Sequence, residues 1–144
     1  MPGTSYDAGV RLLASRAHSV RELRNKLLRR GHAEPEVVAT LERLRGSGYL
    51  DDAAYARGLI SRRSSSRGAR AIAAELAAKG VDREAARAAL GGLEATDQLE
   101  AAVEVARRML RTAPGGQPDL QRVGARLLRR GFSVEVARAA LRRL

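Results

Sequence analysis

The sequence has no cysteine and very few aromatic residues, and both absences restrict what the protein can be. Without cysteine, disulfides and thiolate metal sites are excluded, and only His18 and His32 remain as nitrogen ligands. Two isolated histidines make a poor metal site, so we expect no metal and no other cofactor. Hydrophobic residues make up 44% of the chain but aromatic residues only 3%. The core must therefore be built from Leu, Val and Ala, which favours closely packed helices over a β-sheet.

The sequence also lacks any long hydrophobic run. We therefore expect no membrane span, and the first residues lack the hydrophobic region of a secretory signal, which predicts a cytoplasmic protein. There is no phosphate-binding glycine loop and no nucleophile elbow, and the serines at 64–66 have no suitable histidine. We expect no enzymatic activity.

Positive charge is present in excess. The 144 residues include 27 Lys and Arg against 16 Asp and Glu, which gives a formal net charge of +11. Lys26 and Lys79 are the only lysines. The preference for Arg over Lys is typical of a GC-rich genome, but such bias does not explain the excess of positive charge. That excess indicates an anionic partner: nucleic acid, an acidic protein surface or an anionic membrane.

A threefold repeat organises the chain. Gly31, Gly80 and Gly131 are spaced 49 and 51 residues apart, and the apolar positions around them coincide. Leu23 and Leu27, for example, precede the first glycine at helical spacing. A glycine after basic residues is typical of a helix C-terminus. A period near 50 with matching apolar positions predicts a tandem array.

Each repeat has room for two more helices beside the one that ends at the glycine. Further helical stretches are expected over 6–16, 53–63 and 97–111, and Ser19, Asp82 and Ser133 are predicted N-caps. We therefore predict an all-α fold of three tandem three-helix repeats, at residues 1–50, 51–95 and 96–144. A unit of this size is marginal alone, so stacked neighbours should form an elongated, curved rod.

The turn between the first two repeats carries a resemblance to a known family. Its residues are Gly48, Tyr49, Leu50, Asp51 and Asp52. Inside a threefold helical array this turn resembles the RecX family, over nearly the whole chain. The resemblance implies tandem three-helix repeats that lie in the groove of the RecA–DNA filament and inhibit its ATPase, strand exchange and extension. From the residues alone, Gly48 supplies a positive φ, and Asp51 or Asp52 caps the following helix.

Clustered arginines are the candidate binding residues. No acidic residue lies between positions 53 and 74, a stretch that contains Arg57, Arg62, Arg63, Arg67 and Arg70. Surfaces usually mix both signs of charge, so this cluster predicts a patch that binds phosphate or an acidic partner. The other candidates are the pairs before two of the repeat glycines, namely Arg29, Arg30, Arg129 and Arg130. Their first expected role is to oppose the helix dipole, and binding comes second.

The scarcity of aromatic residues also restricts the way in which DNA can be bound. Tyr6, Tyr49, Tyr55 and Phe132 are all that the chain has, and several fall at expected core positions. Contacts should therefore be made to phosphates without regard to base sequence. Our leading hypothesis is a monomer that binds the RecA filament and the single-stranded DNA within it. The alternative is a stand-alone DNA-binding protein of helix-turn-helix-like units, although no helix carries an obvious base-reading set.

Overall fold

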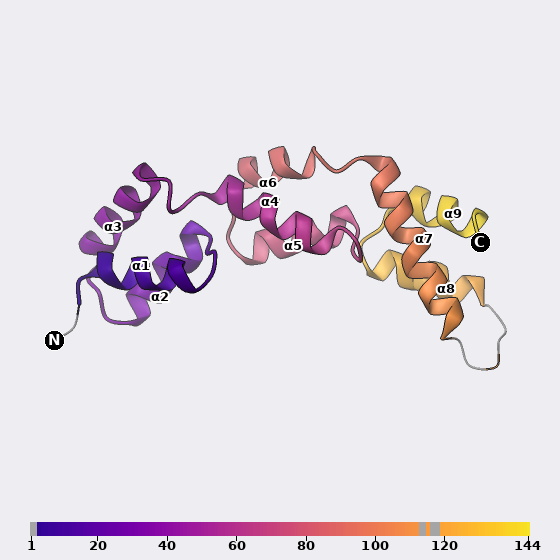
Figure 1. The fold of residues 1–144 in the computed structure, drawn as a ribbon, viewed down its shortest axis with the longest axis horizontal. Coiled ribbons are helices and arrows are strands. Elements are labelled where there is room, and N and C mark those ends of the chain that lie inside the picture. The colour runs from indigo at the N-terminus through magenta and orange to yellow at the C-terminus, as the bar shows by residue number, and fades with distance from the viewer. Residues whose placement is uncertain (1–2, 113–114, 116–118) are drawn as a thin grey trace.

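The computed structural model describes residues 3–112, 115 and 119–144, and within these residues the chain forms α-helices and no strands (Figure 1). In chain order the helices are α1 (Ser5–Ser15), α2 (Val20–Arg29), α3 (Glu34–Gly46), α4 (Asp52–Arg63), α5 (Ala69–Ala78), α6 (Arg83–Leu90), α7 (Ala95–Arg111), α8 (Leu120–Arg129) and α9 (Val134–Arg142). The prediction of an all-α fold is confirmed.

Local capping chemistry sets the starts of these helices. At α2 the Ser19 Oγ accepts a hydrogen bond from the backbone N–H of Glu22, and the Glu22 carboxylate accepts one from the N–H of Ser19. The side chains of Asp82 and Ser133 likewise accept hydrogen bonds from backbone N–H groups at the starts of α6 and α9. All three predicted N-caps are confirmed, and each is worth about 1 kcal/mol of stability.

The three repeat glycines end the second helix of each unit, as predicted. Gly31, Gly80 and Gly131 have φ angles of 92°, 76° and 94°, in the left-handed region that favours glycine. At the first of them the N–H of His32 donates to the carbonyl oxygen of Leu27 at 3.2 Å, and the same bond recurs at the other two. This pattern satisfies the last carbonyl groups of the helix and turns the chain toward the next helix.

Each group of three helices has its own core. Helix pairs with extensive contacts lie within α1–α3, within α4–α6 and within α7–α9. Leu23, Leu27 and Leu44 are fully buried in the first unit, whereas Phe132 is the largest fully buried side chain of the third. The cores contain mainly Leu, Val and Ala, as the composition requires.

The second helices of the three units lie head to tail. At the first junction the Ser19 hydroxyl, at the start of α2, donates to the carbonyl oxygen of Lys79, at the end of α5. At the second, the N–H of Gly68, at the start of α5, donates to the carbonyl oxygen of Arg130, at the end of α8, at 2.9 Å. Ser19 and Gly68 occupy the same repeat position, twelve residues before the capping glycine. The two junctions thus use the same pair of repeat positions, with a hydroxyl donor at the first and a backbone N–H donor at the second.

Close packing at these junctions gives two of the capping glycines a second role. A Cβ on Gly131 would overlap the backbone nitrogen of Ala71, and a Cβ on Gly80 would overlap the side chain of Arg21. Gly31 ends the first unit in the same conformation, but nothing lies within 4 Å of its Cβ position. Only the second and third units therefore need glycine both for the turn and for stacking.

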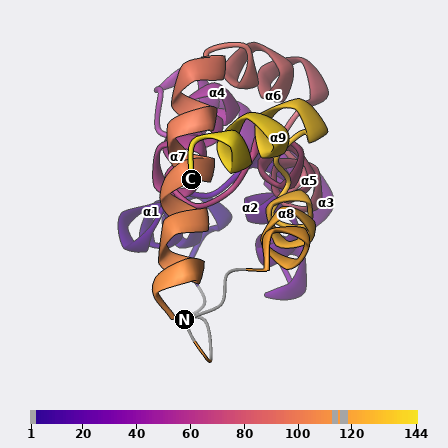
Figure 2. The same cartoon turned by 90° about the vertical axis from the view of Figure 1, so that its right-hand side faces the viewer.

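The stacked units form an elongated, arched rod (Figure 1). Helices α2, α5 and α8 follow its concave side, and they overlap when the rod is viewed along its length (Figure 2). The third helices, α3, α6 and α9, lie toward the convex side. The prediction of three tandem three-helix repeats in an elongated, curved rod is confirmed.

Candidate partner and nucleic-acid interface

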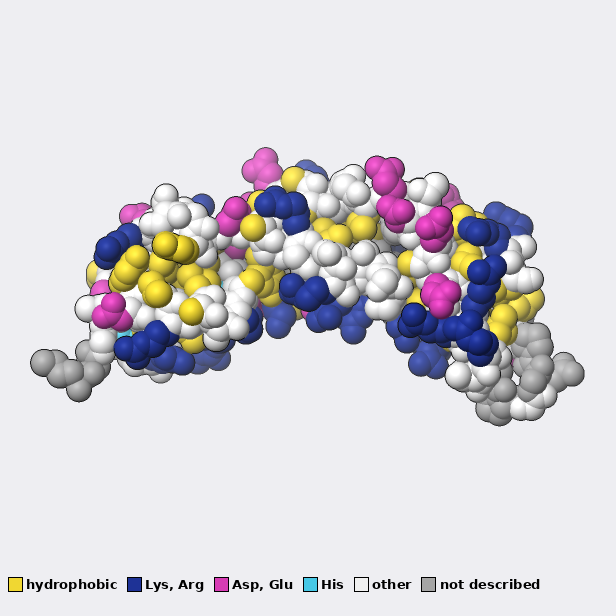
Figure 3. Space-filling model, viewed as in Figure 1, with side chains coloured by type: hydrophobic (Ala, Val, Ile, Leu, Met, Phe, Trp, Pro, Cys, Tyr) yellow, Lys and Arg dark blue, Asp and Glu magenta, His cyan; other side chains and the backbone are white. Residues whose placement is uncertain are grey.

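The concave side of the rod is basic and the convex side carries most of the acidic side chains in view (Figure 3). The basic residues of the three helices along the concave side are Arg21, Arg24, Lys26, Arg29, Arg70, Arg122, Arg126 and Arg129. These helices contain two acidic residues, Glu22 and Glu75, and both are held in ion pairs. We call this surface the concave basic face. Arg24 is paired with Glu34 of α3 at 3.0 Å, and the remaining cations outnumber the acidic residues of these helices.

Part of the predicted arginine cluster is neutralised. The Arg63 guanidinium donates to both carboxylate oxygens of Glu75, at 2.9 and 3.1 Å, and Arg67 reaches one of them at 3.3 Å. These hydrogen bonds, Arg63 first, hold the pKa of Glu75 below its ordinary value. The expectation that no acid compensates the cluster is therefore wrong for these two arginines. Glu75 lies just beyond the acid-free stretch of the sequence. The packing of α5 against α4 places its carboxylate beside Arg63 and Arg67.

The other three members of the cluster are exposed. Arg57, Arg62 and Arg70 take part in none of the ion pairs formed within residues 3–112 and 119–144. Arg70 lies on α5 of the concave basic face, whereas Arg62 lines a groove beside Tyr49. The five arginines of the cluster thus do not form one patch: Arg63 and Arg67 are paired with Glu75, Arg70 lies on α5 and Arg62 lines a groove. A binding role for each remains a prediction.

The arginine pairs before two of the glycines also differ from one another. Arg29, Arg30 and Arg129 are exposed at the ends of α2 and α8. Arg130 is half-buried, and its guanidinium donates to the carbonyl oxygen of Ser66 at 3.3 Å. Arg130 thus helps to join the second and third units, a role that its position in the sequence did not indicate. The predicted binding roles of the exposed arginines remain open to test.

The turn between the first two units is built as its residues predicted. Gly48 has a φ of 80°, and Leu50 is buried in the first core. Asp51 caps α4, because its carboxylate accepts hydrogen bonds from the N–H groups of Ala53 at 2.9 Å and Ala54 at 3.3 Å. Tyr55 and Phe132 lie in the cores, as expected of several of the aromatic residues, whereas the side chain of Tyr49 is 68% exposed.

Asp52 has a separate role that sequence reasoning missed. One of its carboxylate oxygens accepts from the N–H of Val20 at 2.9 Å, at the start of α2. The other accepts from the N–H of Asp82 at 3.3 Å, just before α6. Asp52 therefore ties the first unit to two helices of the second. Its partners lie about thirty residues away on either side, so no local pattern could identify them.

The carboxylate of Glu22 lies close to two cations at the same junction. Its carboxylate lies 3.3 Å from the Arg16 guanidinium and 3.9 Å from the Lys79 ammonium group. Burial raises its pKa, but the hydrogen bonds from Ser19 and Arg16 outweigh burial, so that the pKa lies below its ordinary value. Glu22 is therefore charged at neutral pH and holds the two units together.

His18 lies beside this cluster and is 2% exposed. Its Nδ1 is 2.9 Å from the carbonyl oxygen of Arg16, and its Nε2 is 2.8 Å from the Lys26 ammonium group. Because a carbonyl oxygen only accepts, Nδ1 carries the proton and Nε2 accepts from Lys26. Burial lowers the pKa of His18, and the positive charges of Arg16 and Lys26 lower it further.

Within residues 3–112, 115 and 119–144, no three His, Asp or Glu side chains gather as a group that could hold a metal ion. In the same part of the chain, no helix combines the length and hydrophobicity needed to cross a membrane.

The fold and the concave basic face define a tandem helical repeat protein that is suited to an extended anionic partner. Models of the three RecX three-helix domains match residues 6–44, 51–90 and 96–141 in order. The chain belongs to the RecX family.

Relatives and solved structures agree with this assignment. The regulatory protein RecX of Chromohalobacter salexigens is 39% identical over 140 residues, which cover 96% of this chain and 91% of the relative. That of Mycobacterium avium is 35% identical over 133 residues, which cover 89% and 77%. That of Bacillus licheniformis is 34% identical, but the match covers 51% of its length. The crystal structure of RecX from Lactobacillus salivarius has the same fold, with a TM-score of 0.87 at 21% identity over 97% of this chain and 94% of the other. A regulatory role follows from these relatives.

Proposed function

We propose that this chain acts in the cytoplasm as a monomer that binds the RecA filament on single-stranded DNA and lowers its ATPase, strand exchange and extension. Family membership supports the choice of partner. The observation that carries the proposal is the concave basic face, which runs through all three units (Figure 3). Its three ten-residue helices, placed end to end, span roughly 45 Å. We expect one copy to contact more than one filament subunit.

The charges of the rod favour one orientation on the filament. The concave basic face attracts phosphates, whereas the acidic side chains of the convex side repel them. Tyr55 and Phe132 are buried, so base stacking contributes little on this face. DNA contacts of this kind are insensitive to base sequence and weaken steeply as salt is raised.

The experiment that tests this function is a titration of the protein into RecA filaments on single-stranded DNA, with steady-state ATP hydrolysis as the readout. We expect inhibition at well below one copy per RecA, because each rod holds several subunits. Binding to the same DNA without RecA is measured in parallel and should be weak. If hydrolysis is unchanged across the titration while bare DNA is bound tightly, the chain is instead a stand-alone DNA-binding protein.

A further inference from the structure

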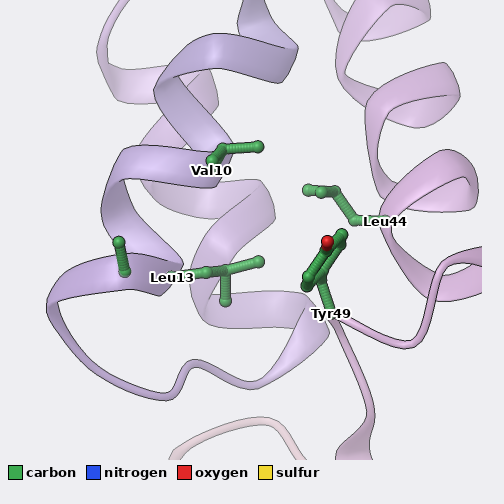
Figure 4. A pocket seen from close by; sticks show the side chains of 5 residues that line it. Val10, Leu13, Leu44 and Tyr49 are labelled. Atoms are coloured by element: carbon green, nitrogen blue, oxygen red, sulfur yellow. The ribbon is translucent and has the colours of Figure 1, made fainter.

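An open apolar groove lies beside the turn that joins the first two units, and no residue of α2, α5 or α8 lines it. It is lined by Val10, Leu13, Ala14, Leu44 and Tyr49. Figure 4 shows the side chains of Val10 and Leu13, from α1, converging with those of Leu44, from α3, and Tyr49. The groove has a volume of about 220 Å³, which exceeds the roughly 150 Å³ of an apolar cavity known to accept benzene. It has room for one bulky apolar side chain.

A second, more polar depression continues from this groove into the second unit. Leu13 and Tyr49 line both, and the second also includes Gly58 and Arg62 of α4. A Cβ on Gly58 would lie 3.4 Å from the Arg62 guanidinium, at ordinary contact distance, so Arg62 lies close over the backbone of Gly58. Arg62 takes part in no ion pair within the described residues. The two depressions together place an apolar site next to a free cation. We call them the Tyr49 groove.

Two other polar side chains of the Tyr49 groove already have partners. The Asp51 Oδ1 accepts from two N–H groups of α4, and both ring nitrogens of His18 have partners. Arg62 is the cation that the groove offers to a ligand, and it favours an anionic group. Asp51 caps α4 and Gly48 supplies the positive φ of the turn, so neither of these functions requires the side chain at position 49.

Hydrophobic side chains on the surface of the first unit lie apart from the concave basic face. In Figure 3 hydrophobic side chains gather on the flank of the first unit that faces the viewer, whereas the basic side chains follow the concave edge below. DNA that lies along the concave edge leaves this flank uncovered. The walls are mainly aliphatic and offer few hydrogen-bonding groups to the edges of a base.

We propose that the Tyr49 groove binds a segment of the partner protein in which a bulky apolar side chain is followed by a carboxylate. The apolar side chain enters between Val10, Leu13 and Leu44 and packs on Tyr49, and the carboxylate pairs with Arg62. Charge complementarity selects an acidic segment over a basic one. That the segment belongs to RecA rests on the proposed function. The groove then supplies the protein contact, while the concave basic face supplies the contact to DNA.

The direct test uses ¹⁵N-labelled protein and a capped peptide, Gly-Phe-Gly-Glu-Glu-Gly, followed by NMR. We expect shifts at Leu13, Ala14, Leu44 and Tyr49 and at the side chain of Arg62. Replacing Phe by Ala, or both Glu by Gln, should weaken binding several-fold. Tyr49→Ala should weaken it likewise, and Arg62→Gln should abolish the preference for Glu over Gln. Val38→Ala is the matched control, since Val38 is 44% exposed on α3 and does not line the groove.

Two results would overturn the proposal: no shift with the peptide, or shifts of the same residues by an oligothymidylate, which would make the groove a base-stacking site. A second arm measures binding to RecA filaments. Tyr49→Ala should weaken filament binding and leave binding to bare DNA unchanged, whereas equal filament binding by Tyr49→Ala and the parent would exclude RecA as the source. A parent that does not bind filaments defeats the proposed function, and the peptide titration still decides the groove.

Discussion

At the scale of single residues, adjacent side chains of the same type have different roles. Asp51 caps the helix that it precedes, whereas Asp52 accepts hydrogen bonds from backbone groups of α2 and of the α6 cap. The sequence could identify a capping aspartate here, because a cap is a local relation between neighbours. It could not identify the bridge, because the partners of Asp52 come together only when the first two units stack.

The two aspartates should therefore differ in mutational cost. Asp51→Ala removes one cap and should lower the free energy of unfolding by about 1 kcal/mol. Asp52→Ala leaves the part-buried N–H of Val20 at the unit junction without a partner, whereas the exposed N–H of Asp82 can bond to water. It should cost about 2–3 kcal/mol, since a buried donor that loses its partner costs roughly 1–3 kcal/mol and the junction is weakened as well. Urea denaturation of both variants beside the parent measures the difference. Equal losses would contradict the bridging role.

His18 should make stability depend on pH. Its pKa in the folded protein lies below the ordinary value of 6.5, because burial disfavours the charged form. The unfolded chain therefore takes up a proton first as the pH falls. The stability that neutral His18 provides is complete above about pH 6.5 and is lost as the pH falls through the lower folded-state pKa.

Thermal melts between pH 7.5 and 5 check this, since the carboxylates with lowered pKa values, Glu22 and Glu75, stay charged in that range. The parent should lose stability on acidification, and His18→Gln should show a flatter dependence from a lower starting value. A parent melting temperature that does not change between these pH values would contradict the buried, neutral state of His18.

At the scale of elements, the sequence predicted the helices well and their lateral contacts poorly. Ser19, Asp82, Ser133 and the three glycines mark helix ends through bonds to residues within a few positions, so local patterns sufficed. The ion pairs of Glu75 join α4 to α5, and the hydrogen bond of Arg130 joins α8 to the loop before α5. Such contacts depend on how helices pack, and side-chain spacing along one helix does not specify packing partners.

The repeat glycines allow turn formation to be separated from unit stacking. Gly31→Ala introduces only backbone strain at positive φ, about 1–2 kcal/mol. Gly131→Ala introduces the same strain and also an overlap with Ala71 of the second unit, so it should destabilise more. It should also loosen the third unit from the second. Amide hydrogen exchange measures this as lost protection at the start of α5, for which Gly31→Ala is the matched control. Equal effects of the two substitutions at α5 would show that Gly131 is needed for its turn alone.

At the scale of the whole molecule, the arrangement of charge matters more than its sum. A net charge of +11 indicated an anionic partner, but the sequence did not indicate which face would meet it. Arg29, Arg70 and Arg129 belong, one from each unit, to the second helices, which lie head to tail along the concave side of the rod (Figure 1). This arrangement of the helices is held by the junction bonds of Ser19 and Gly68. It could not be predicted, because a repeat period fixes the units but not how one unit is turned relative to the next.

The central claim is that the concave basic face carries the regulatory activity, and a comparison of two triple variants tests it most directly. One variant replaces Arg29, Arg70 and Arg129 by Gln. The control makes the same replacement at one exposed arginine from each third helix, Arg45, Arg87 and Arg138. Both lose three charges and should keep the parent's circular-dichroism melt, since exposed charges contribute little to stability. In a titration against RecA filaments on single-stranded DNA at fixed salt, the first variant should need at least ten times more protein for half-inhibition of ATP hydrolysis. The control should stay within about twofold of the parent, and equal weakening of both variants would contradict the claim.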